Sequence, residues 1–107
     1  MVLQPALRHR HASIGGVEKV IKKIRGTGRA ALLTVDVLGL HLPFVASVRT
    51  AIEQRCGIPA AHILIACSHT HAGPATMLLE GCGVINETYQ ARLQQALVEV
   101  ARQAWAQ

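Results

Sequence analysis

Two short apolar runs restrict the folds open to this chain more than any other feature of its sequence. Residues 30–38 (AALLTVDVL) and 62–67 (HILIAC) are rich in aliphatic and β-branched side chains, which is typical of buried strands. About 20 residues separate the runs, the length of a helical crossover between two parallel strands. Because both runs are almost continuously apolar, we expect both faces of their sheet to be covered.

The segments between and after these runs carry helix signals. Pro43 suits a first helical turn and Gly57 suits a helix C-terminus, so we predict a helix over residues 43–56. With Asn86 as its N-cap, we predict a second helix over 86–105. Their apolar faces would be Val45, Val48, Ile52 and Cys56 in the first, and Tyr89, Leu93, Ala96, Leu97, Val100 and Ala104 in the second. A chain of 107 residues suffices for one domain, here an α/β fold built as a small parallel-sheet βαβα unit.

Positive charge is concentrated in the first quarter of the chain. Residues 1–29 hold seven Lys or Arg and one Glu, whereas residues 30–107 hold four Lys or Arg and five acidic residues. Four apolar residues of the basic segment recur at helical spacing between Gly16 and Gly26: Val17, Val20, Ile21 and Ile24. We therefore predict a short basic amphipathic helix, preceded by a loose segment over residues 1–13. It is either a solvated surface helix or an interaction module, but without an aromatic residue to stack on bases we expect no nucleic-acid partner.

The cysteines and the hydropathy of the chain bear on its compartment. The three cysteines, Cys56, Cys67 and Cys82, have no regular spacing, so we expect reduced thiols in the cytoplasm. Cys56 lies on the apolar face of the first predicted helix and is expected in the core. The sequence shows no signal peptide and no apolar run of transmembrane length.

The second apolar run leads directly into two histidines, His69 and His71, followed by the turn-forming pair Gly73-Pro74. Ligands of parallel sheets bind beyond the carboxyl ends of the strands, where Asp36 should also lie. If the backbone stays extended through His71, both imidazoles point the same way and can converge on one zinc ion. Alternatively one binds metal while the other faces a substrate, or both are hydrogen-bonded surface groups.

Two further interpretations use the cysteine at the end of this run. Cys67 and Cys82 could complete a Cys₂His₂ structural zinc site with the two histidines, although the spacing matches no zinc finger. Cys67 could also act as a nucleophile beside His69, although no third residue is in place to orient that histidine.

The wider pattern is more specific than the histidines alone. ALLTVDVLGL, a helix that carries Arg49, and GIPAAHILIACSHTHAGP together resemble the N-terminal domain of the neutral/alkaline ceramidases and their bacterial relatives. That family carries a phrase close to T-H-T-H-S-G-P at the end of a strand. The resemblance covers about residues 29–107 and is strongest over 56–74, which makes 29–107 part of a larger ceramidase-like α/β domain and leaves 1–28 as a basic, unassigned segment.

The resemblance implies a zinc-dependent amide hydrolase that releases a fatty acid and a sphingoid base from a ceramide-like lipid. By position, His69 matches the zinc ligand of the family. His71 matches the residue that faces the carbonyl and stabilises the developing oxyanion. Asp36 matches an acidic residue of the preceding strand, for which we assign no catalytic role; helix capping or loop bracing is the alternative.

The chain also departs from the family in three respects. The other zinc ligands of the family, a second His, a Glu and a Tyr, come from far downstream, whereas this chain ends at Gln107. Ala72 stands where the family usually has Ser, and the region before residue 29 cannot be aligned. We therefore expect a partial site that is inactive alone, with further ligands from a downstream portion, a partner chain, or Glu80 if its loop folds back. The alternatives are a non-catalytic small α/β domain or a basic interaction module over 8–29.

Overall fold

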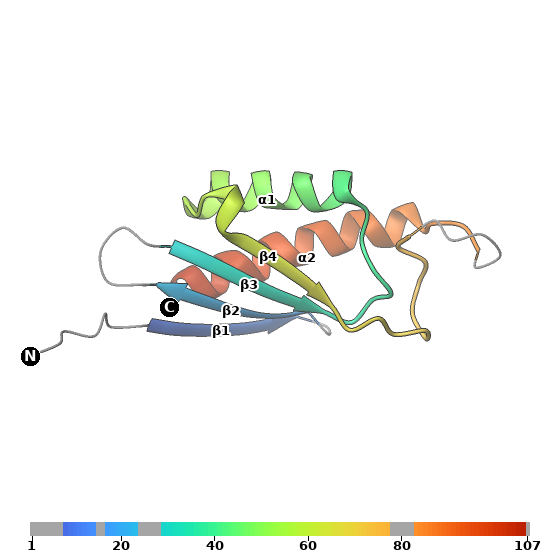
Figure 1. The fold of residues 1–107 in the computed structure, drawn as a ribbon, viewed down its shortest axis with the longest axis horizontal. Helices are drawn as coiled ribbons and strands as arrows, with labels where there is room; N and C mark the ends of the chain where they lie inside the picture. Colours follow the sequence, from blue (N-terminus) through green and yellow to red (C-terminus); the bar gives the residue numbers. More distant parts are fainter. Residues whose placement is uncertain (1–7, 15–16, 24–28, 78–82, 107) are drawn as a thin grey trace, which may run out of the picture.

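The computed structural model describes residues 8–14, 17–23, 29–77 and 83–106. They form a four-stranded sheet with two α-helices and one 3-10 turn (Figure 1). In chain order the elements are β1 (Arg8–Ile14), β2 (Val17–Lys23), β3 (Arg29–Val35), α1 (Leu42–Cys56), η1 (Ala60–His62), β4 (Ile63–Cys67) and α2 (Glu87–Ala106).

The two apolar runs form adjacent parallel strands, as predicted. β3 and β4 pair from Ala31 opposite Ile63 to Val35 opposite Cys67, and α1 provides the crossover between them. The chain is therefore a small α/β unit, as the sequence indicates. The sheet is mixed rather than purely parallel, however, because β1 and β2 add two antiparallel strands in the order β1-β2-β3-β4.

The predictions for the basic N-terminal segment are wrong. Residues 8–13, expected to be loose, form β1 together with Ile14, and residues 17–23, expected to be helical, form β2. Ile14 pairs with Val17, and the two residues between them in the sequence are Gly15 and Gly16, a dipeptide typical of hairpins. Val and Ile also favour strands over helices, because their branched side chains lose χ1 freedom in a helix. The remaining residues of these two predictions, 1–7 and 24–25, lie outside the described residues.

Both helices pack on one face of the sheet, which corrects the expectation that both faces are covered. Figure 1 shows α2 lying across the sheet and α1 beside it. Alternate residues of β3 enter one core with both helices, formed by Ala31, Leu33, Val35, Val48, Ile52, Leu93, Leu97, Val100 and Ala104 among others. In β4, Ile63 is buried whereas Leu64 is 59% exposed, because neighbouring residues of a strand point to opposite faces.

The predicted helix ends are confirmed. Pro43 lies in the first turn of α1, and Gly57 ends the helix in the left-handed conformation with φ 71°, donating its N–H to Glu53 O at 2.9 Å. Asn86 caps α2 by accepting the Tyr89 N–H on Oδ1 at 3.0 Å. Within the described part of the chain, neither helix is long and apolar enough to cross a bilayer.

Two side chains of the crossover helix hold the segment that leads into β4. Arg49, in the middle of α1, donates from Nε to Ile63 O at 2.9 Å. Glu53, one turn later, accepts the Ala60 N–H on Oε2 at 2.9 Å. These two bonds set where β4 begins, and so where its carboxyl end delivers the residues that follow Cys67.

Candidate functional site

The candidate site lies beyond the carboxyl ends of β3 and β4, in residues 68–77, here called the histidine loop. The path of β4 continues alongside residues 35–37, because Ser68 N donates to Val35 O and His69 N to Val37 O, each at 3.1 Å. Both histidines of the loop are exposed at this edge of the sheet, because they follow the carboxyl end of β4. The parallel pairing of β3 and β4 therefore sets the position of the site.

The backbone reaches the second histidine by a turn rather than by the expected extended strand. β4 ends at Cys67, and His69 has φ 64°, in the left-handed region that non-glycine residues seldom occupy. The two imidazole rings nevertheless meet edge to face, with centroids 5.0 Å apart and planes at 73°. A turn, and not an extended strand, therefore brings the rings of His69 and His71 into contact.

A contact with a backbone carbonyl indicates the orientation and the tautomer of one of the two rings. His69 Nδ1 lies 2.8 Å from Leu38 O, in the connection between β3 and α1. Because a carbonyl oxygen can only accept, Nδ1 must carry the proton. The neutral imidazole then has its lone pair on Nε2, the arrangement typical of a histidine that binds a metal through Nε2.

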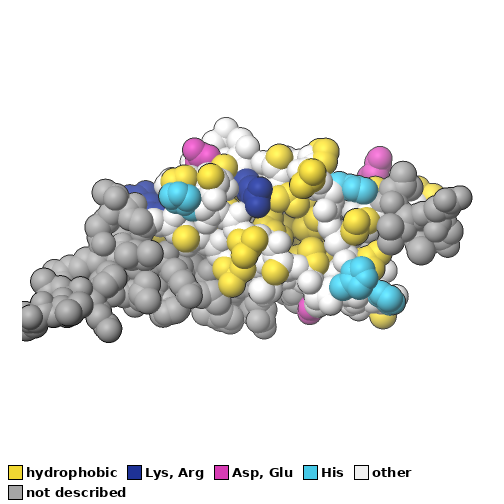
Figure 2. All heavy atoms as spheres, in the orientation of Figure 1, with side chains coloured by type: hydrophobic (Ala, Val, Ile, Leu, Met, Phe, Trp, Pro, Cys, Tyr) yellow, Lys and Arg dark blue, Asp and Glu magenta, His cyan; other side chains and the backbone are white. Residues whose placement is uncertain are grey.

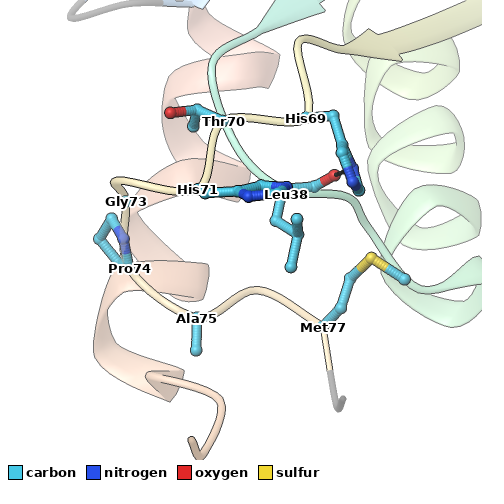
Figure 3. A pocket seen from close by; sticks show the side chains of 8 residues that line it. All are labelled: Leu38, His69, Thr70, His71, Gly73, Pro74, Ala75 and Met77. Carbon is cyan, nitrogen blue, oxygen red and sulfur yellow. Dashed lines mark hydrogen bonds between the residues drawn. The ribbon is translucent and has the colours of Figure 1, made fainter. Parts of the chain in front are cut away.

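The two imidazoles border a cavity of about 480 Å³. Figure 3 shows the side chains of Leu38 and Met77 on the same side of the loop as the two rings. The full lining is Leu38, His69, Thr70, His71, Gly73, Pro74, Ala75 and Met77. Apolar walls with a few converging polar groups are typical of small-molecule sites.

The base of the histidine loop is held by a residue that the sequence analysis did not identify. Thr76 is fully buried, donates from Oγ1 to Gly39 O at 2.6 Å, and accepts on its own carbonyl from Gln90 Nε2 at 3.0 Å. No local signal marks Thr76, because its partner Gly39 lies 37 residues earlier in the chain.

The structure gives no support to Cys67 as a nucleophile. Burial raises the pKa of its thiol, so the group is neutral at pH 7 and weakly nucleophilic. Cys56 is buried in the core, as predicted. The Cys₂His₂ interpretation requires Cys82 at the site, and the folded-back loop requires Glu80. Both residues lie outside the described residues.

Asp36 follows β3 directly and is exposed, but it does not line the cavity. The described residues contain no group of three or more His, Cys, Asp or Glu side chains placed to hold a metal. The site thus brings together two of the predicted residues, His69 and His71, and leaves Asp36 apart from them.

The donor set fits part of a zinc site. Zinc binds imidazole nitrogen, and catalytic zinc usually takes three protein ligands and keeps one open position. His69 presents Nε2 with its other nitrogen bonded to a carbonyl, and the ring of His71 lies beside it. Comparison of the chain with protein-family models, with curated proteins and with solved structures gives no match.

Proposed function

We propose that the histidine loop is the zinc-binding edge of a ceramidase-like amide hydrolase. His69 would bind the metal through Nε2, and His71 would face the carbonyl of the substrate. The observation that carries the proposal is the bond from His69 Nδ1 to Leu38 O, with the second imidazole 5.0 Å away. This is the arrangement that a metal-binding histidine requires, beside a second group able to donate a hydrogen bond.

The residues around the pair suit a lipid amide. Leu38 and Met77 contribute apolar side chains to the cavity, where an acyl or sphingoid chain can replace water. Zinc bound at this edge would polarise the amide carbonyl and lower the pKa of its bound water toward about 7. His71 would donate a hydrogen bond to the oxygen on which negative charge develops.

A catalytic site needs more ligands than this loop supplies. His69 provides one zinc ligand and His71 one stabilising group, whereas a catalytic zinc usually takes three protein ligands. The remaining ligands would come from a further portion of the protein or from a partner chain. We therefore expect residues 1–107 alone to bind zinc weakly and to release no fatty acid from ceramide.

We also propose a cytoplasmic location, with which the thiols accord. Within the described residues, Cys56 and Cys67 are not joined in a disulfide. Cytosolic reductants keep such thiols reduced, whereas secreted small domains usually pair them.

The test combines zinc titration with a ceramide hydrolysis assay. His69→Ala should abolish the weak zinc binding seen by calorimetry. The matched control is His62→Ala, because His62 is also exposed and its Nδ1 also lies within hydrogen-bond distance of a backbone carbonyl, Arg29 O at 2.9 Å. Zinc binding that survives His69→Ala would place the metal elsewhere and would contradict the proposal.

The hydrolysis assay addresses the second half of the proposal. Labelled ceramide with zinc should yield no fatty acid above background with this chain. Zinc-dependent turnover that is lost in His69→Ala would show that the site is right and that the chain needs no further ligands. If no zinc binds at all, the non-catalytic α/β domain becomes the better account.

A further inference from the structure

Three consecutive carbonyl groups, those of residues 37–39, hold both ends of the histidine loop. The three bonds run from His69 N to Val37 O (3.1 Å), from His69 Nδ1 to Leu38 O (2.8 Å) and from Thr76 Oγ1 to Gly39 O (2.6 Å). The loop leaves this short segment at His69 and returns to it at Thr76. A change at one carbonyl is therefore transmitted to its neighbours in the same segment.

Thr76 is the buried member of this arrangement. Its side chain is fully buried, and a buried hydroxyl requires a hydrogen-bond partner, which Gly39 O provides. Its carbonyl accepts from Gln90 Nε2 at 3.0 Å, and Asn86 N donates to Ala75 O at 3.1 Å. The returning end of the loop is thus attached to the first residues of α2 as well as to Gly39.

Gly39 lies directly against the side chain of Met77. A Cβ atom built on Gly39 would lie 2.2 Å from Met77 Sδ and 3.3 Å from Met77 Cγ, closer than side chains pack. A side chain at residue 39 would therefore displace the flexible end of Met77. The Cα of Gly39 shares one planar peptide unit with the Leu38 carbonyl, so a movement of Gly39 also moves that carbonyl.

We infer that Thr76 is a positioning residue of the site, which selects the tautomer of His69. The Thr76 hydroxyl holds Gly39, Gly39 directs the Leu38 carbonyl, and that carbonyl keeps the proton of His69 on Nδ1. The lone pair on Nε2 then faces a ligand. The inference rests on the proposed function where it takes His69 as a metal ligand, but the tautomer exists without any metal.

The test is the tautomer of His69 in the metal-free full chain. Long-range proton–nitrogen spectra of ¹⁵N-labelled protein distinguish the two neutral tautomers. The spectra are recorded at a pH well above the ordinary imidazole pKa of about 6.5, where the ring is neutral. The unaltered chain should show His69 with its proton on Nδ1. Thr76→Val keeps the volume but removes the donor, so the Nε2–H form of His69 should appear beside it. Thr76→Ser, which keeps a hydroxyl, should restore the single form.

Two controls distinguish an effect on the position of His69 from a general destabilisation of the fold. The His62 tautomer, held at the other end of the sheet, should not change in Thr76→Val, and Thr50→Val on the exposed face of α1 should change neither histidine. Zinc affinity should fall about tenfold in Thr76→Val and recover in Thr76→Ser, as for other residues that orient a metal ligand. If the unaltered chain binds no zinc, the proposed function fails while the tautomer result still decides the role of Thr76.

A second variant reaches the same carbonyl without altering Thr76. Gly39→Ala should shift the His69 tautomer as Thr76→Val does, and adding Met77→Ala should reverse the shift, because the truncated side chain leaves room for the Cβ. Folded Thr76→Val or Gly39→Ala proteins, as judged by circular dichroism, with the His69 tautomer unchanged would overturn the inference.

Discussion

A histidine lies at each end of β4. The two histidines make the same hydrogen bond to a backbone carbonyl, but different groups surround them. His62 precedes the strand and His69 follows it; both are exposed, and both have Nδ1 within 2.9 Å of a backbone carbonyl. Figure 2 shows histidine side chains toward both ends of the molecule, on the same face. A histidine bonded to a carbonyl is therefore not enough to identify a site.

The surroundings distinguish the two. His69 has a second imidazole 5.0 Å away and borders a cavity of about 480 Å³. His62 is held by the carbonyl of Arg29, whose guanidinium carbon lies 5.4 Å from the centroid of the Trp105 ring. The guanidinium gives the His62 end a positive charge, which disfavours a metal cation. The neighbours of the two histidines, more than the histidines themselves, are therefore the reason to propose His69 and not His62 as the metal ligand.

Removing the two N-terminal strands, which support the sheet at both ends of β4, should have the largest effect on stability. Deleting residues 1–23 removes β1 and β2 (Figure 1). β2 pairs along the whole of β3, β1 pairs with β2, and both strands contact α2. We expect the cooperative thermal transition to be lost. Circular dichroism of the truncated chain is the measurement, and an unchanged transition would mean that β3, β4 and the helices suffice.

Truncating a core side chain should destabilise the surroundings of both histidines equally. Leu33 is fully buried in β3, midway between the carbonyls of residues 29 and 38 that hold the two histidines. Leu33→Ala should lower the free energy of unfolding by about 2–5 kcal/mol, through lost burial and the cavity left behind. Urea denaturation measures this loss. A tautomer change at only one of the two histidines would contradict the view that they share one core.

A substitution near His62 should lower the stability of the chain but leave its zinc affinity unchanged. Arg29→Met keeps the aliphatic stem, but it removes the contact with Trp105 and the bond from Nη1 to Gly57 O at 3.2 Å. We expect a loss of about 1 kcal/mol, because exposed cation–π contacts and hydrogen bonds each contribute about that much or less. Thermal melting measures the loss, and zinc titration of the same variant should match the unaltered chain. Weakened zinc binding would show that the two ends are coupled.

The smallest effect concerns a surface pair in α2. A hydrogen bond from Arg102 lowers the pKa of Glu99 to about 2. A lowered pKa adds stability above the unfolded value of about 4.3, and this contribution is lost as the pH falls toward 2. The pair is solvent-exposed, so the effect should be slight and should shrink further in salt. Melting curves of Glu99→Gln between pH 6 and about 2 should run closer to those of the unaltered chain at the acid end; a gap that widens there would contradict the sign.

The sequence was most informative where local signals and burial agree. Pro43, Gly57 and Asn86 mark the helix ends by local chemistry, and the apolar runs mark β3 and β4. The apolar residues at positions 17, 20 and 21 follow a helical period rather than the alternation of a strand, so pairing with β1 and β3, and not the local pattern, decides in favour of a strand. At the candidate site, residue types alone selected His69 and His71 as candidates, and the structure places their rings together. The left-handed turn at His69 and the contact from Thr76 to Gly39 depend on distant parts of the chain, so no local pattern predicts them.

The central claim is that His69, and not His62, is a metal ligand, and direct observation of the imidazole nitrogens tests it. Zinc is added stepwise to ¹⁵N-labelled chain while long-range proton–nitrogen spectra are recorded. We predict that the Nε2 signal of His69 moves toward the shift of a metal-bound nitrogen, that the His71 signals change with it, and that His62 keeps its free-state shifts. An unchanged His69 in the presence of zinc, or an equal response from His62, would contradict the account.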